Sequence, residues 1–188
     1  MKLNICIDID GTITDPYYWL KYINEYFKSD LKPEGLVKFD VCRVLNIPEE
    51  DYDVFYDLKG EQIHRDCVPR PYAKEVIKEL SKQHNIYFVT ARPEKYRKVS
   101  QQWLDDNGFV GKLFMVGGHD KVGQAKELNC DYFIEDRYRN AVKLAQAGIN
   151  VFLIDTNYNR YPLIDNMKRV NDWMDIKREF NTAENIAS

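Results

Sequence analysis

Residues 2–14 read KLNICIDIDGTIT and contain two carboxylates on which the interpretation of the whole chain depends. The apolar, isoleucine-rich run before them predicts a buried strand. It ends on Asp8 and Asp10, and Gly11 follows as a residue that permits a sharp turn. Open α/β sheets bind ligands at such strand ends. Two neighbouring carboxylates repel each other unless a cation or a proton neutralises one, so the segment predicts a Mg²⁺ site, an acid/base pair, or both.

Three later stretches place further polar residues at or near the ends of predicted strands. The sequence FVTAR, residues 88–92, ends a strand at Thr90. Lys121 follows in the sequence HDK, and the sequence IEDR then ends another strand on Glu135 and Asp136. With DIDGT, these stretches resemble, in order, the four motifs of the haloacid dehalogenase (HAD) superfamily. The sequences IDIDGTIT, VTARP and IEDR are most similar to the 5'(3')-deoxyribonucleotidase branch and its bacterial relatives.

The chain after residue 70 alternates between strand and helix patterns. Such alternation is typical of an α/β fold in which helices flank a parallel sheet, and the resemblance implies a Rossmann-like HAD core. We expect strands at residues 3–8, 85–90, 112–116, 131–135 and 150–154. We expect helices at residues 71–84, 93–107, 121–128, 138–147 and 172–180, with the polar residues after 180 frayed.

Residues 15–70 interrupt this alternation and show no pattern typical of a buried strand. Their apolar and aromatic residues predict helices at 16–28, 39–45 and 49–58. The resemblance implies that the segment is a small helical cap inserted after the first strand. We therefore expect two units, an α/β core formed by residues 1–14 and 71–188 and a cap formed by residues 15–70.

Asp8 and Asp10 are the candidate catalytic residues. A carboxylate can attack phosphorus and form an acyl-phosphate, which divides hydrolysis into two easier steps, and the resemblance implies this role for Asp8. For Asp10 it implies a general acid and base that protonates the leaving oxygen and then activates water. Without the other motifs, the same residues would be interpreted as a solvated acid at a strand end and a capping residue in a turn.

The metal ligands are expected to be oxygens, because Mg²⁺ prefers hard ligands and retains part of its water shell. The resemblance implies three ligands, the carboxylates of Asp8 and Asp136 and the backbone carbonyl of Asp10. Glu135 stands where the family commonly has an Asp, and we interpret it as a residue that orients a metal-bound water. Between the two neighbouring acids, we favour Asp136 as the direct ligand.

Phosphate-binding residues are implied around the second and third motifs. The Thr90 hydroxyl and nearby N–H groups, including that of Ala91, can hold a phosphate oxygen, although a threonine here is also suited to strand formation or helix capping. Lys121 would neutralise the phosphoryl oxygens and Asp8, since charge stabilisation dominates phosphoryl transfer. Lys126 is the alternative lysine.

Aromatic side chains of the predicted cap are candidates for contact with the substrate. Tyr17, Tyr18, Trp19 and Phe39 could stack on a nucleobase or pack only against the helices of the cap, and the sequence does not decide between the two. Arg92, next to the second motif, could reach a phosphate or hold the loop of that motif.

Composition restricts the class of partner. The chain has 188 residues, a formal net charge of −3 and a sequence pI of ≈ 5.7, which provides no electrostatic footprint for nucleic acid. Apolar runs fall short of the ~20 residues that span a bilayer, and the first residues show no signal-peptide pattern. The four scattered cysteines fit reduced thiols in a cytoplasmic protein. The sequence leaves the oligomeric state open, a homodimer included.

The motifs together predict a Mg²⁺-dependent phosphomonoester hydrolase that acts through an aspartyl-phosphate. The best substrate hypothesis is a (deoxy)nucleoside monophosphate, which would make the protein a 5'-nucleotidase. A phosphatase of sugar phosphates or other small phosphorylated metabolites is the enzymatic alternative. A non-catalytic phosphate-binding or regulatory protein is the alternative of another class. The presence of all the motif residues argues against the last, because a silent descendant has no need to keep them.

Overall fold

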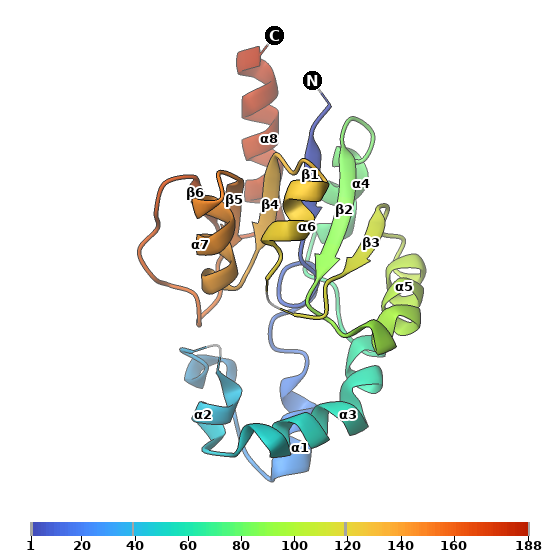
Figure 1. Cartoon of the computed structure of the whole chain (residues 1–188), viewed down its shortest axis with the longest axis vertical. Helices are drawn as coiled ribbons and strands as arrows, with labels where there is room; N and C mark the ends of the chain where they lie inside the picture. The colour runs from blue at the N-terminus through green and yellow to red at the C-terminus, as the bar shows by residue number, and fades with distance from the viewer. Residues whose placement is uncertain (1, 39, 119, 188) are drawn as a thin grey trace.

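The structure is a computed structural model that describes residues 2–38, 40–118 and 120–187, with side chains as far as residue 182. The described residues form a six-stranded parallel sheet in the order β3-β2-β1-β4-β5-β6 (Figure 1). The strands are β1 (Asn4–Ile7), β2 (Asn85–Thr90), β3 (Lys112–Met115), β4 (Tyr132–Glu135), β5 (Asn150–Ile154) and β6 (Met167–Val170). The predicted α/β fold is confirmed, and the first five strands lie where the sequence pattern places them.

The sequence pattern does not predict β6. This strand pairs in parallel with β5 at the edge of the sheet. Within it Val170 is buried and Lys168 is exposed, so the apolar signal is weak. Charged residues are common on edge strands, where they discourage further strand pairing, and such strands are correspondingly hard to detect from apolar periodicity.

Helices connect the strands and cover the sheet. They are α1 (Leu20–Phe27), α2 (Val41–Leu45), α3 (Glu49–Arg65), α4 (Ala73–Leu80), α5 (Arg97–Asp106), α6 (Val122–Glu127), α7 (Tyr138–Gln146) and α8 (Trp173–Ala187), with the short 3-10 helices η1 (Pro33–Gly35) and η2 (Glu94–Tyr96). The prediction of fraying after residue 180 is wrong for the backbone. The residues from 181 to 187 include neither proline nor glycine, so nothing in them breaks α8.

α3 is longer than the sequence predicts. It continues to Arg65 because Gly60, which suggests a helix end, lies inside the helix. A Cβ at Gly60 would lie 2.4 Å from the hydroxyl oxygen of Tyr96. The glycine therefore serves a close approach between α3 and η2 rather than a helix end.

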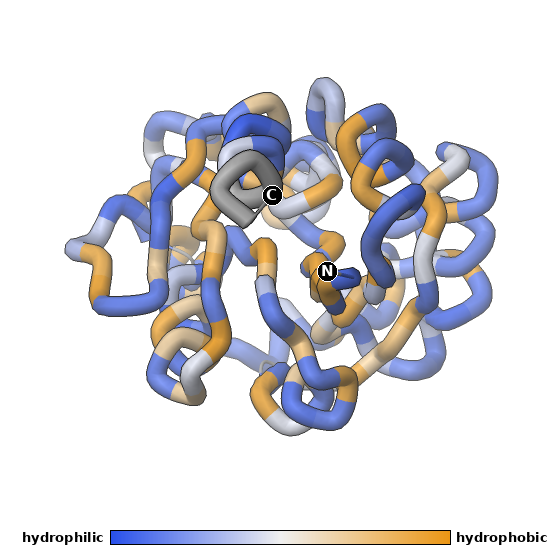
Figure 2. The backbone as a smooth tube through the Cα atoms, turned by 90° about the horizontal axis from the view of Figure 1, so that it is seen from above, coloured by the Kyte–Doolittle hydropathy of each residue, from blue (hydrophilic) through white to orange (hydrophobic). Residues whose placement is uncertain are grey.

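Different helices cover the two faces of the sheet, because neighbouring residues of a strand point to opposite faces. In β1, Ile5 and Ile7 belong to a hydrophobic core shared with α4, α5 and α8, whereas Cys6 belongs to a core shared with α6 and α7. Figure 2 shows hydrophilic stretches predominating at the periphery of the molecule. None of the described helices is long and apolar enough to cross a membrane.

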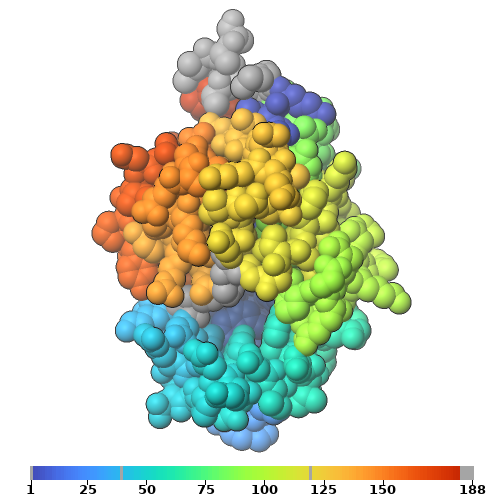
Figure 3. Space-filling model, in the orientation of Figure 1, coloured from blue at the N-terminus to red at the C-terminus, as the bar shows by residue number. Residues whose placement is uncertain are grey.

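Residues 15–70, called here the helical segment, follow β1 and contain α1, α2 and α3. These helices lie beyond the carboxyl ends of the strands (Figure 1) and form a hydrophobic cluster of their own around Tyr22, Ile23, Phe55 and Ile63. The outgoing and returning chain pass side by side, where Thr14 and Pro69 form an antiparallel bridge. Figure 3 shows the surface hollowed between the helical segment and the α/β part, with N-terminal residues visible in the hollow.

Candidate active site

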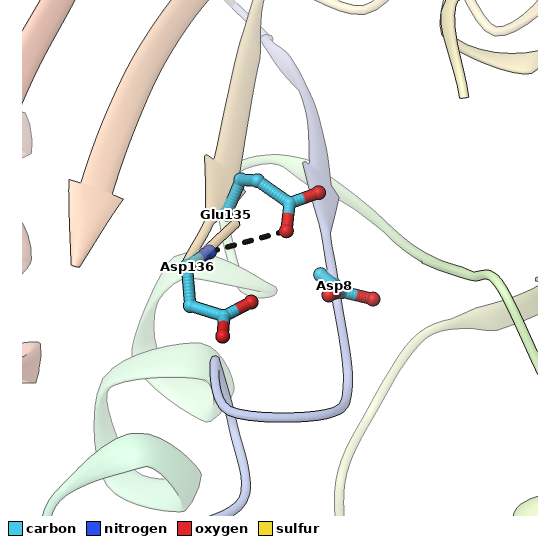
Figure 4. A group of neighbouring side chains, drawn as sticks. All are labelled: Asp8, Glu135 and Asp136. Carbon is cyan, nitrogen blue, oxygen red and sulfur yellow. Dashed lines mark hydrogen bonds between the residues drawn. The ribbon is translucent and has the colours of Figure 1, made fainter. Parts of the chain in front are cut away.

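Two adjacent strands, β1 and β4, end in carboxylates. The chain builds β2 and β3 on one side of β1 and then returns to place β4 on the other side. Open α/β sheets bind ligands at the carboxyl end of such a reversal in strand order. Asp8, Glu135 and Asp136 meet at this point, with one carboxylate oxygen of each within 4.8 Å of the others (Figure 4).

Lys121 lies among these carboxylates, directly before α6. Its Nζ is 2.6 Å from Asp8 Oδ1 and 2.9 Å from Glu135 Oε2. Burial would lower the pKa of Lys121, but the two carboxylates outweigh burial and raise it, so the ammonium stays charged. Lys126, the alternative lysine, is exposed on α6. The structure thus brings the lysine of the third motif onto the candidate nucleophile.

Glu135 is engaged by protein donors on both oxygens. Its Oε1 accepts hydrogen bonds from the N–H groups of Asp136 and Arg137, at 3.2 and 3.0 Å. Its Oε2 accepts from Lys121 Nζ at 2.9 Å and from Asn140 Nδ2 at 3.3 Å. Burial would raise the pKa of Glu135, but Lys121 and the Arg137 N–H outweigh burial and lower it. Glu135 therefore acts as an ionised anchor for Lys121 and for the start of α7.

Asp136 is held at its side chain and at its backbone. The Tyr158 hydroxyl donates to Asp136 Oδ2, Thr12 Oγ1 lies 3.4 Å from Oδ1, and Asn159 Nδ2 donates to the Asp136 carbonyl at 2.7 Å. A Cβ on Gly11 would lie 2.2 Å from Asp136 Oδ2, and Gly11 has a φ of +79°. The turn after β1 thus needs glycine both for its conformation and for its approach to Asp136.

The carboxylate cluster carries an excess of negative charge. Three buried carboxylates face the single ammonium of Lys121, which leaves two negative charges uncompensated within the cluster. Burial raises the pKa of Asp8 well above its usual value, against the effect of Lys121. Burial and the charge of Glu135 raise the pKa of Asp136 to about 7. A divalent cation would compensate this charge and favour the ionised forms, so the buried oxygen donors fit a divalent metal site.

Asp10 has a different set of partners from Asp8. Arg92 Nε and Nη2 donate to its two carboxylate oxygens at 2.8 and 2.7 Å, and the Tyr18 hydroxyl donates to Oδ1 at 3.0 Å. His64 Nδ1 is 3.9 Å from the same Oδ1. Burial would raise the pKa of Asp10, but Arg92 outweighs burial and lowers it well below its usual range. Asp10 is therefore a carboxylate in this arrangement.

Arg92 connects Asp10 to the second motif. Its guanidinium also donates to Ser100 Oγ at 3.0 Å, and its backbone N–H donates to Thr90 Oγ1 at 3.2 Å. The sequence suggests that Arg92 reaches a phosphate or holds the Thr90 loop, whereas the structure places its guanidinium on Asp10 and its N–H on Thr90. Thr90 is buried at the end of β2, and the half-buried Ala91 follows it.

The aromatic residues predicted to contact the substrate have partners within the protein. Tyr17 Oη accepts a hydrogen bond from the Asn157 N–H at 3.0 Å, and its ring meets that of Tyr158 edge-on, with centroids 6.2 Å apart. Trp19 packs against the hydrophobic cluster of the helical segment. Phe39 lies outside the described residues. Stacking of a nucleobase on these residues stays a prediction.

Sequence reasoning missed several residues of the site. Tyr158 and Asn159 bind Asp136, and their position shortly after a predicted strand was the available signal. His64 approaches Asp10 from α3. Its location depends on how the helical segment packs, so no local pattern reveals it.

Comparison with known proteins identifies the family. The family model described as "5' nucleotidase, deoxy (Pyrimidine), cytosolic type C protein" matches residues 2–184. A nucleotidase of Clostridium acetobutylicum is 43% identical over 176 residues, which cover 93% of this chain and 92% of the relative. A 5'(3')-deoxyribonucleotidase of the same species is 26% identical over 178 residues, which cover 94% and 93% of the two chains.

Solved structures share the fold. A haloacid dehalogenase-like hydrolase of Streptococcus pneumoniae matches with a TM-score of 0.69 at 12% identity, over 95% of this chain and 98% of that one. The Bacillus subtilis protein YfnB, solved with magnesium bound, matches with a TM-score of 0.65 at 13% identity, over 96% and 99% of the two chains. The resemblance drawn from the sequence motifs is confirmed. The chain belongs to the cytosolic type C family of 5'-nucleotidases and has a haloacid dehalogenase-like fold.

Proposed function

We propose that this nucleotidase hydrolyses (deoxy)nucleoside monophosphates with Mg²⁺ as its cofactor and Asp8 as its nucleophile. The observation that carries the proposal is the buried contact of 2.6 Å between Lys121 Nζ and Asp8 Oδ1, next to Asp136. A carboxylate oriented in this way at the ligand-binding end of a parallel sheet is suited to attack phosphorus. Membership of the nucleotidase family supports the substrate class.

Asp8, Asp136 and the Asp10 carbonyl would hold the cation. When bound, Mg²⁺ would neutralise charge on the phosphoryl oxygens and orient the ester. The two uncompensated negative charges of the cluster support this assignment. Glu135 would position Lys121 and the backbone after β4 rather than bind the cation, since protein donors engage both of its oxygens.

Hydrolysis would proceed in two displacements at phosphorus. Asp8 attacks, a bond forms between its carboxylate oxygen and phosphorus, and the bond from phosphorus to the leaving oxygen breaks while Asp10 supplies a proton to that oxygen. A water molecule then attacks phosphorus, Asp10 takes its proton, and the bond to Asp8 breaks to release phosphate. Lys121, the Thr90 hydroxyl and the Ala91 N–H would hold the phosphoryl oxygens and stabilise the developing charge.

Asp10 would have to change partners between these steps. Arg92 and Tyr18 keep it ionised in the described arrangement, which suits its role as a base toward water. To act as an acid it must carry a proton. The oxygen of the leaving group would therefore replace Arg92 or Tyr18 beside one of the Asp10 oxygens.

Residues 15–70 would act as a cap on a core formed by residues 1–14 and 71–188. The separate hydrophobic cluster of the helical segment and the paired chain passages at Thr14 and Pro69 support this division. A cap that closes over Asp8 would exclude bulk water from the aspartyl-phosphate. Tyr17, Trp19 and Phe39 would be its candidate substrate contacts. The cytosolic description of the family supports a cytoplasmic location.

A panel of phosphate esters tests the proposal. With Mg²⁺ present, deoxyribonucleoside and ribonucleoside monophosphates should release phosphate with a higher kcat/KM than sugar phosphates or a chromogenic aryl phosphate. Chelation with EDTA should abolish release, and added Mg²⁺ should restore it. A higher kcat/KM on sugar phosphates would favour the alternative metabolite phosphatase, and no release from any ester would contradict an enzymatic function.

A further inference from the structure

The loop that follows β5, residues 155–160, contacts the carboxylate cluster from the side opposite Lys121's helix in the chain order. Its Tyr158 hydroxyl donates to Asp136 Oδ2, and its Asn159 Nδ2 donates to the Asp136 carbonyl at 2.7 Å. Tyr158 is 7% exposed and Asn159 is fully buried. The loop therefore fixes both the carboxylate and the backbone of Asp136.

The same loop is anchored to the edge of the sheet. Arg169 of β6 donates from Nη1 to Asn159 Oδ1 at 2.7 Å and to Asp155 Oδ1 at 3.1 Å. It also donates from Nη2 to the Asn159 carbonyl at 3.0 Å. Because these contacts lie within the α/β part, they hold the backbone of the loop independently of the helical segment.

The other side of the loop contacts the helical segment. The Tyr17 ring meets the Tyr158 ring edge-on, with an interplanar angle of 80°, and Tyr17 Oη accepts from the Asn157 N–H at 3.0 Å. Asn157 Nδ2 donates to the Pro33 carbonyl at 2.8 Å. Tyr158 is thus placed between Asp136 and an aromatic ring of the helical segment.

We propose that Tyr158 is a positioning residue for cation binding and that Tyr17 holds Tyr158 in place. By engaging Oδ2, the Tyr158 hydroxyl fixes the rotation of the Asp136 carboxylate and leaves Oδ1 for the cation. Loss of a partner that orients a metal ligand typically lowers metal affinity about 10–100-fold. This inference rests on the divalent-cation site of the proposed function, and it makes cation affinity depend on a residue of the helical segment.

Calorimetric titration of the metal-free protein with MgCl₂, without substrate, tests the first half. Tyr158→Phe keeps the ring and removes the hydroxyl, so the Kd for Mg²⁺ should rise about 10–100-fold. Tyr161→Phe is the matched control, because Tyr161 lies just after this loop and is 46% exposed. Its Kd should equal that of the wild type. A Kd for Tyr158→Phe within about twofold of the wild-type value would overturn the role of the hydroxyl.

The second half is tested by Tyr17→Leu, which leaves every donor to Asp136 in place. Its Kd for Mg²⁺ should rise by less than that of Tyr158→Phe. Since Tyr17 acts through Tyr158, the double variant should bind Mg²⁺ no more weakly than Tyr158→Phe alone. An unchanged Kd for Tyr17→Leu, or additive losses in the double variant, would overturn the coupling.

The titrations also separate this inference from the proposed function. Absence of Mg²⁺ binding by the wild-type protein would contradict the cation site itself. Tight binding by the wild type and by both tyrosine variants would contradict the positioning role alone. Circular dichroism of each metal-free variant establishes that it is folded, and if Tyr158→Phe does not fold, an unchanged Kd for Tyr17→Leu still overturns the proposal.

Discussion

Asp8 and Asp10 lie two positions apart in the sequence but in different surroundings in the structure. The partners of Asp8 belong to the α/β part, where Lys121 holds it in an almost fully buried position with 8% of its side chain exposed. Asp10 is 39% exposed and is shared between the two parts of the molecule. Arg92 reaches it from the end of β2, and Tyr18 reaches it from the helical segment.

The comparison separates a rigid region from an adjustable one. The hydrogen bonds of a parallel sheet set the position of Asp8, so its charge environment should not depend on the helical segment. The environment of Asp10 includes a hydroxyl of that segment, so it should change when the segment moves. A nucleophile benefits from fixed geometry, whereas a group that both donates and accepts a proton benefits from partners that can change.

Asp8→Asn should have the largest effect and would break the comparison if it did not. The amide keeps the size of the side chain but cannot act as an anionic nucleophile, so turnover should fall by about 10⁴-fold or more on every ester. Phosphate release from nucleoside monophosphates and from an aryl phosphate measures it. Substantial turnover by this variant would exclude Asp8 as the nucleophile.

Asp10→Asn should have an effect that depends on the leaving group. Loss of a general acid and base commonly costs about 10²–10⁴-fold, and the loss should be smaller for an aryl phosphate, whose leaving oxygen needs less help from a proton. Rates of single turnover on a nucleotide and on an aryl phosphate measure the difference. Equal losses on both esters would argue that Asp10 has a structural role.

Lys121→Met should destabilise the protein as well as slow it. Removal of one partner from a buried ion pair typically costs about 3–5 kcal/mol, because the remaining charges lose their compensation. Chemical denaturation in the presence of Mg²⁺ measures the loss, and Lys126→Met is the matched control from an exposed position on α6. Similar stabilities for the two variants would mean that Lys121 is not the buried counter-charge described above.

Stabilisation by Mg²⁺ should grow with pH. Burial and Glu135 raise the pKa of Asp136 to about 7 without the cation, so below this pH a proton occupies the carboxylate and competes with Mg²⁺. At about 100 times its Kd, a cation stabilises the folded state by about 2.7 kcal/mol, and part of this should be lost as the pH falls through about 7. Thermal unfolding with and without Mg²⁺ at several pH values measures it. A Mg²⁺ effect that is constant across this range would contradict the assignment.

The sequence predicts the parts of the site that follow directly from strand ends. Asp8, Glu135 and Asp136 could be placed together because parallel strands end at the same edge of the sheet, and the motif order supplied Lys121. The arrangement of Asp10 could not be predicted in the same way. β1 ends at Ile7, so Asp8 and Asp10 no longer alternate as strand residues, and the turn at Gly11 directs them to different partners.

Contacts made across the molecule are the part that the sequence leaves undetermined. The guanidinium of Arg92 binds Asp10 only because the loop after β2 lies next to the turn after β1. Tyr158 reaches Asp136 from a loop with no helical or strand pattern. Such contacts depend on the packing of loops against each other, which apolar periodicity does not describe.

A crystal structure of the wild-type protein with Mg²⁺ and BeF₃⁻ tests the central claim most directly. BeF₃⁻ mimics a phosphoryl group bound to a carboxylate. The account predicts BeF₃⁻ on Asp8, in contact with Lys121, and Mg²⁺ bound by Asp8 and Asp136 at about 2.0–2.1 Å. BeF₃⁻ on Asp10, or Mg²⁺ bound away from Asp136, would contradict it.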